Sequence, residues 1–158
     1  MTHLWVNLQG TLSDNNLSLE AAKAGLPGSL GRTLADRIGP RAIADARASG
    51  LAAVCVTVGH VLGDADALAT TLDDIDRWDA FLAQRADVFS KAFSAAQVRQ
   101  AVAAGRIAVV PGFQNSEMLG DDAARVSQFA RRGIRIMQLT YNGANRVGPA
   151  AWCRRRRG

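Results

Sequence analysis

Three segments of the chain share one pattern of apolar and polar positions: an amphipathic helical stretch, a glycine, and then a run of mostly apolar residues. A glycine directly after a helix takes the left-handed conformation that ends it. Near-continuous apolar runs are typical of strands buried on both faces. We therefore predict three helix–strand units. Their helices cover residues 40–49, 95–104 and 122–132, their glycines are Gly50, Gly105 and Gly133, and their strands cover residues 51–58, 106–113 and 134–141.

The predicted helices also carry residues that are typical of helix starts. Pro40 fits the first position of a helix, and Ser94 with Gln97 has the spacing of a capping box. Asp121 is placed to cap the third helix. Between the first two units, residues 66–85 have apolar side chains at near-helical spacing, which predicts a long amphipathic helix.

Residues 4–8 predict a first or edge strand, and residues 88–93 predict a short one. Strands that alternate with helices form parallel units, so the fold class is α/β. This order alone leaves two architectures open, a (β/α) barrel and a doubly wound sheet. The spacing from Gly105 to Gly133 is close to one unit of a (β/α)8 TIM-type barrel, which typically needs about 250 residues. A chain of 158 residues would hold roughly the first half of such a barrel.

Charge and composition exclude several classes of protein. The formal net charge is +5, but residues 154–157 are all arginine and account for most of it, so the composition gives little support to nucleic-acid binding. No apolar run approaches the roughly 20 residues of a membrane span, and no signal peptide is recognisable, so we expect a cytoplasmic protein. Cys55 is predicted to be a small core residue, and its spacing from Cys153 matches neither a zinc site nor a disulfide framework.

Three sequence segments resemble the membrane (renal) dipeptidase family of zinc peptidases, in its N-terminal half only. They are residues 45–60, residues 95–122, and residues 133–145. The most specific motif is in the third, where Leu139-Thr140-Tyr141-Asn142 is followed three residues later by Asn145. The resemblance implies a (β/α)8 barrel in which a binuclear zinc site activates a water molecule for attack on a dipeptide.

The family's metal ligands do not carry over onto this chain. The resemblance calls for a His-x-Asp pair on the first strand, but residues 5–10 read WVNLQG. The bridging glutamate of the family falls on Gln114, a neutral amide that substitutes poorly for a carboxylate between two dications. The family's remaining histidine ligands belong to the second half of the barrel. Zinc is expected for the family, but we expect this chain to bind none and to be a truncated or degenerate, inactive member.

Polar residues that follow the predicted strands are candidates for a substrate pocket, because loops at the carboxyl ends of barrel strands build active sites. For each, the alternative is a loop side chain that bonds to nearby backbone. No residue is assigned a catalytic role. The candidates are His60, Gln114, Asn115, Tyr141, Asn142 and Asn145, with Glu117 beside them.

Two groups of acidic residues are better explained without metal. Asp121 and Asp122 could be a carboxylate pair for a metal, but a helix cap with first-turn acids accounts for them. The aspartates of the long helix are expected to form a solvated face rather than a metal cluster. These are Asp73, Asp74, Asp76 and Asp79.

The expected partners follow from the half-barrel prediction. A complete barrel would bind a dipeptide-like small molecule, whereas nucleic acid and membrane are not expected. Open strand edges at residues 4–8 and 134–141 predict self-association. The alternative to a dipeptidase-like enzyme is a non-catalytic α/β binding or assembly module.

The domain prediction divides the chain near residue 148. Residues 1–148 are expected to form the half barrel, and residues 149–158 an atypical basic tail. The tail is rich in arginine and alanine and has neither helical nor strand periodicity, which is typical of GC-rich codons translated out of frame. We therefore expect a frameshift or truncation near codon 148.

Overall fold

The computed structural model describes residues 4–10, 12, 38–61 and 65–150. The predicted basic tail lies outside the described residues from position 151 onward. Within the described part, no helix has the length and apolar character that crossing a membrane requires.

The order of helices and strands is the one that the sequence predicts. Gly50, Gly105 and Gly133 end their helices with φ angles of 74°, 69° and 96°, in the left-handed region. The elements are β1 (Trp5–Gly10), α2 (Pro40–Ala48), β2 (Leu51–Thr57), α3 (Ala67–Gln84), β3 (Phe89–Lys91), α4 (Ala95–Ala103), β4 (Ile107–Phe113), the 3-10 turn η2 (Glu117–Leu119), α5 (Arg125–Arg131) and β5 (Ile136–Met137).

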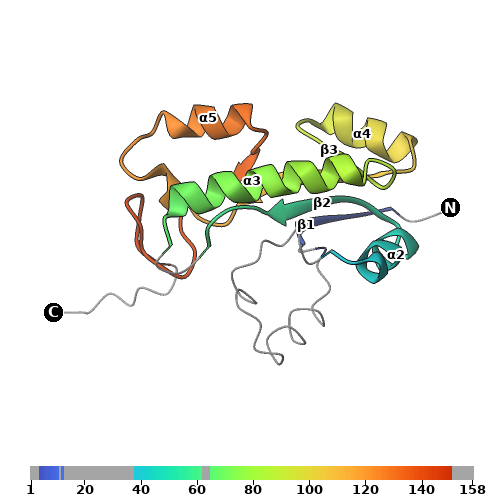
Figure 1. The fold of residues 1–158 in the computed structure, drawn as a ribbon, viewed down its shortest axis with the longest axis horizontal. Coiled ribbons are helices and arrows are strands. Elements are labelled where there is room, and N and C mark those ends of the chain that lie inside the picture. Colours follow the sequence, from blue (N-terminus) through green and yellow to red (C-terminus); the bar gives the residue numbers. More distant parts are fainter. Residues whose placement is uncertain (1–3, 11, 13–37, 62–64, 151–158) are drawn as a thin grey trace, which may run out of the picture.

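All pairings in the five-stranded sheet are parallel, and the sheet curls into half of a TIM-type barrel. β2 lies between β1 and β4. β3 and β5 share the other edge of β4, where β3 pairs with Ile107–Val109 and β5 pairs with Gly112 and Phe113. Figure 1 shows α3 running alongside the sheet and α2 at the amino end of β2. The strands therefore all present their carboxyl ends at one end of the half barrel.

The two faces of the sheet carry different cores. Val54, Val56 and Val58 belong to the larger cluster, together with buried side chains of α2, α3 and α5. Ala53 and Ala108 point to the opposite face of the sheet and belong to a small alanine cluster beside α4. Because successive side chains of a strand point to opposite faces, the apolar run of β2 supplies both clusters.

The last predicted strand is much shorter than expected. Only Ile136–Met137 pairs with β4, although the pattern predicts a strand over residues 134–141. Single backbone bonds flank the pair, from Arg135 N to Pro111 O and from Gln138 N to Phe113 O. β4 ends at Phe113, so the described residues after Gln138 have no strand beside them to continue the ladder.

The start of α5 also differs from the prediction. The helix begins at Arg125 rather than at residue 122, and its N-cap residue, Ala124, forms no side-chain cap. Asp122 accepts a hydrogen bond from the amide of Ala124 at 2.9 Å, while Asp121 forms an ion pair with Arg146 at 3.2 Å. The prediction that Asp121 caps this helix is therefore wrong, because the preceding residues form a separate turn.

The other predicted caps are confirmed. Pro40 occupies the first turn of α2, and the Ser94 hydroxyl accepts a hydrogen bond from the amide of Gln97 at 3.3 Å. The Gln97 side chain bonds back to the amide of Phe93 at 2.6 Å, one residue before the cap. At the start of α3, where no cap was predicted, the Asp66 carboxylate accepts a hydrogen bond from the amide of Ala69 at 2.9 Å.

Candidate functional site

A small pocket lies where the segments that follow β2, β4 and β5 meet. Its volume is about 190 Å³. In a parallel half barrel these segments meet at the carboxyl ends of the strands, the end at which such barrels build their sites. The residues that line the pocket are Val61, Asn115, Glu117, Tyr141, Gly143, Ala144 and Asn145.

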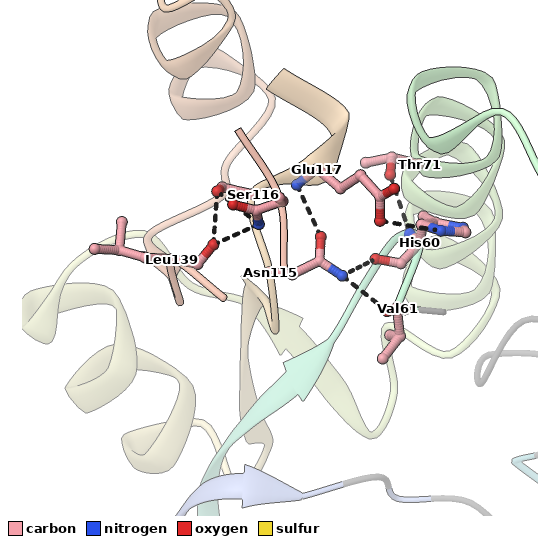
Figure 2. A network of polar contacts seen from close by, with 8 residues as sticks. His60, Val61, Thr71, Asn115, Ser116, Glu117 and Leu139 are labelled. Carbon is pink, nitrogen blue, oxygen red and sulfur yellow. Dashed lines mark hydrogen bonds and ion pairs between the residues drawn. The ribbon is translucent and has the colours of Figure 1, made fainter. Parts of the chain in front are cut away.

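Asn115 joins the segment after β2 to the segment after β4. Its side-chain NH₂ donates to the carbonyl oxygens of His60, at 3.1 Å, and Val61, at 2.9 Å. Its side-chain oxygen accepts from the amide of Glu117 at 2.9 Å, as Figure 2 shows. Asn115 is buried, so its polar groups need these partners. The three bonds position both the loop and Glu117.

Asn145 holds the segment after β5 in a similar way. Its side-chain NH₂ donates to Leu139 O at 2.7 Å and to the Ser116 hydroxyl at 3.4 Å. Its side-chain oxygen accepts from the amides of Val147 and Gly148. The buried Ser116 hydroxyl also donates to Leu139 O at 2.7 Å. The loop after β5 is thereby fixed to the end of β4.

His60 lies behind the pocket rather than in its lining. The residue is only 4% exposed, and its backbone amide donates to the Thr71 hydroxyl at 3.0 Å. Its Nε2 is 3.5 Å from a carboxylate oxygen of Glu117, a distance typical of an ion pair. Within the described residues, this nitrogen has no hydrogen-bond partner. Figure 2 shows the imidazole directed toward the Glu117 carboxylate.

Asp74 is a site-supporting residue that the sequence interpretation missed. Its carboxylate accepts a hydrogen bond from the amide of Gly59 at 2.6 Å, and it is buried on α3. The prediction of a solvated aspartate face is therefore wrong at this position, whereas Asp73 and Asp76 are exposed. Helical spacing contained the signal, because Asp74 lies three residues after the buried Thr71, on the apolar stripe of the helix.

The remaining candidates have different positions. Tyr141 is half-buried and lines the pocket. Asn142 is exposed, and Gln114 is half-buried directly after β4; neither is among the pocket-lining residues. The structure thus gathers Asn115, Tyr141 and Asn145 around one cavity. A role for any of them in contacting substrate stays a prediction.

The described residues at this end of the sheet do not fit a binuclear zinc centre. The resemblance assigns the bridging carboxylate to the position of Gln114, and the sequence of β1, WVNLQG, contains no His-x-Asp pair. In the described part of the chain, no three His, Cys, Asp or Glu residues are grouped so that they could hold a metal ion. Zinc prefers thiolate, imidazole and carboxylate ligands, so the donor set is unsuitable.

Comparisons with known proteins identify what the chain resembles. The family model described as membrane dipeptidase (Peptidase family M19) matches residues 40–157, more than half of the chain. A comparison with curated proteins found no match.

Two solved structures from Pseudomonas aeruginosa are similar in fold. One is an amidohydrolase, with a TM-score of 0.62 and 29% identity over 68% of this chain and 32% of its own. The other is the probable dipeptidase PvdM, with a TM-score of 0.55 and 19% identity over 65% of this chain and 28% of its own. This chain thus spans about a third of the length of those proteins.

Proposed function

Since this chain belongs to the membrane dipeptidase family, we propose that it binds a dipeptide-like small amide at the carboxyl ends of β2, β4 and β5. We also propose that its described residues do not build a binuclear zinc centre. Both parts of the proposal rest on a difference between the hydrogen-bonded loops around the pocket and the expected metal-ligand position. The loops around the pocket are held by a dense set of hydrogen bonds, whereas the position that corresponds to the bridging ligand holds Gln114.

The size and chemistry of the pocket suit a fragment of a peptide. A volume of about 190 Å³ lies below the roughly 300–1,000 Å³ of pockets for drug-sized ligands, so this pocket suits a small fragment such as one amino-acid residue. The lining combines apolar surface from Val61 and Ala144 with the carboxylate of Glu117 and the ring of Tyr141. Ligand pockets commonly combine an apolar wall with a few fixed polar groups in this way.

The donor set argues against the family's zinc-dependent hydrolysis in this part of the molecule. Two-metal hydrolysis requires anionic ligands that bridge or flank the ions. The next acidic residues along the chain after Glu117 are Asp121 and Asp122, and both have protein partners. Asp121 pairs with Arg146, and Asp122 lies 3.7 Å from Arg125 while it caps the amide of Ala124.

A second candidate function, a non-catalytic assembly module, is favoured by the exposed apolar side chains of the first strand. Trp5, Val6 and Leu8 are 64%, 61% and 75% exposed, respectively. Exposed apolar side chains on an edge strand mark sites of association. The two candidates differ in one measurable respect: the first requires saturable binding of a dipeptide.

Purified protein tests the proposal directly. After dialysis, elemental analysis is expected to find well under one zinc ion per chain, and added dipeptides such as Gly-Ala should bind without being cleaved. Gln114→Glu is the matched variant, and it should not gain tightly held zinc, because no group of three metal-ligating side chains lies among the described residues. Dipeptide turnover with one or more tightly held zinc ions would refute the zinc-free site. Absence of dipeptide binding would favour the assembly module.

A further inference from the structure

We propose that Glu117 and Tyr141 form a subsite for a primary ammonium group, such as the N-terminus of a dipeptide. The subsite deepens the proposed function and rests on it for the choice of a peptide. It is argued from which polar groups of the pocket are still available to a ligand, and which the protein already uses.

The two asparagine side chains of the pocket are used by the protein. Asn115 donates to two carbonyl oxygens and accepts from the amide of Glu117. Asn145 donates to Leu139 O and accepts from two amides of its own loop. Both amides are therefore positioning groups. Among the described residues that line the pocket, this leaves the Glu117 carboxylate and the Tyr141 hydroxyl as side-chain polar groups for a ligand.

The charge of the pocket favours a cation. Of the lining residues that the structure describes, Glu117 is the charged one, and its side chain is 50% exposed. Arg146, which follows the lining residue Asn145, is engaged in an ion pair with Asp121 at 3.2 Å. A concave site with a single carboxylate attracts a positive group and repels a carboxylate.

His60 holds the carboxylate from the buried side. Its Nε2 lies 3.5 Å from Oε2 of Glu117, and the imidazole is 3% exposed and is not part of the lining. This nitrogen has no hydrogen-bond partner in the described part of the chain. Oε2 of Glu117 thus lies beside the imidazole, while the side chain is half exposed and lines the pocket. His60 is a positioning residue here, because it acts through Glu117.

Hydrogen-bond chemistry distinguishes the ammonium group from other ligands. An ammonium group has three donors and no acceptor, whereas a carboxylate has only acceptors. Glu117 accepts, and the hydroxyl of Tyr141 can accept through its lone pairs. An ammonium group has enough donors to serve both groups, with a third donor for water. A small amine without a peptide is therefore a sufficient probe.

The test is a titration of the whole chain with glycinamide near pH 7, below the ordinary pKa of an α-amino group. Binding is followed by the NMR signals of the Tyr141 and His60 rings. N-acetylglycinamide is the matched neutral probe, and it should bind at least about tenfold more weakly, since a charge-assisted hydrogen bond is lost. Glu117→Gln should weaken glycinamide binding by about tenfold, and Tyr141→Phe should weaken it severalfold. Asp45→Asn, on α2 at the other end of the strands, should leave it unchanged.

The possible outcomes separate the subsite from the proposed function. Equal binding of glycinamide and N-acetylglycinamide overturns the subsite, and so does a folded Glu117→Gln protein that binds glycinamide like the wild type. Should Glu117→Gln fail to fold, the two probes and Tyr141→Phe still decide the matter. Glycinamide binding without Gly-Ala binding supports the subsite and refutes the dipeptide function. If Gly-Ala binds and Glu117→Gln does not weaken that binding, the dipeptide function is supported and the subsite is refuted.

Discussion

The backbone amide of Gly59 donates a 2.6 Å hydrogen bond to the carboxylate of Asp74, fifteen residues further along the chain. This bond joins the segment after β2 to the buried face of α3. The approach is close, because a Cβ atom at Gly59 would lie 2.8 Å from side-chain atoms of Thr71, and the φ of Gly59 is +84°. The Thr71 hydroxyl accepts from the next amide, that of His60. The helix therefore fixes the backbone on which His60 is placed.

Replacement of Asp74 should measure the strength of this junction. Asp74→Ala is expected to lower the free energy of unfolding by about 2 kcal/mol, because a partly buried amide loses a charged acceptor. Asp73→Ala is the control, since Asp73 is exposed and forms only an i,i+4 pair with Arg77, worth about 0.5 kcal/mol or less. Urea denaturation of both variants gives the comparison. Equal losses would show that the junction contributes little.

The long helix illustrates how far the sequence predicts this fold. Its apolar spacing predicts a helix over residues 66–85, within one residue of the bounds of α3 at each end. A charged residue type predicts exposure for Asp74, whereas its position on the apolar stripe of α3 predicts burial. A carboxylate on the apolar stripe is buried only if a distant donor meets it, and that donor, the Gly59 amide, is set by tertiary structure.

Asn115→Asp tests the loop junction with a nearly isosteric change. The carboxylate cannot donate to the carbonyl oxygens of His60 and Val61, so two bonds are lost and like partial charges face each other. We expect a loss of about 2–3 kcal/mol in unfolding free energy. The exposed Asn142→Asp is the control and should change stability by less than about 0.5 kcal/mol. Thermal unfolding at one pH compares them. A stability of Asn115→Asp close to that of the control would contradict the assigned bonds.

The pocket could be predicted only in part, and particular residues show why. The rule that loops after parallel strands build sites selects Asn115, Tyr141 and Asn145, and all three line one cavity, while contact with a substrate stays a prediction. It could not distinguish positioning groups from free ones, because that depends on which carbonyl oxygens lie within reach. Asn142 and Gln114 follow the same strands but do not line the cavity. The sequence also does not predict the short length of β5, because that length depends on where its neighbour β4 ends.

Cys55 should react slowly with alkylating reagents in the folded protein. Burial raises the pKa of the Cys55 thiol above its ordinary value, so less reactive thiolate is present at a given pH. The neutral thiol favours the folded state below the ordinary thiol pKa, and this contribution is lost as the pH rises through the raised pKa. Iodoacetamide labelling near pH 8, read by peptide mass spectrometry so that Cys153 is counted separately, should be several times slower than in urea. Equal rates would contradict the shift.

The exposed first strand predicts self-association, which no observation yet tests. Leu8 is 75% exposed on β1, and Ile136 is 44% exposed on β5. Light scattering after size-exclusion chromatography should find dimers or larger species. Leu8→Lys should shift the distribution toward monomer, because charges on an edge strand oppose pairing. Leu72→Lys is the control, since Leu72 is 37% exposed on the helix α3 rather than on an edge strand. A monodisperse wild-type monomer would exclude this association.

The two edges of β4 have a consequence for the order in which the molecule opens. β2 pairs with Ala108–Gly112 along one edge, and β3 and β5 divide the other edge, where they pair with Ile107–Val109 and with Gly112 and Phe113. Among the described strands, β1 pairs only with β2, with two interruptions in register. Local opening starts where fewest contacts must break. Amide protons of β1 should therefore exchange with solvent first. Those of β4 should exchange only on nearly complete unfolding, so β4 should be the most protected strand of the half barrel.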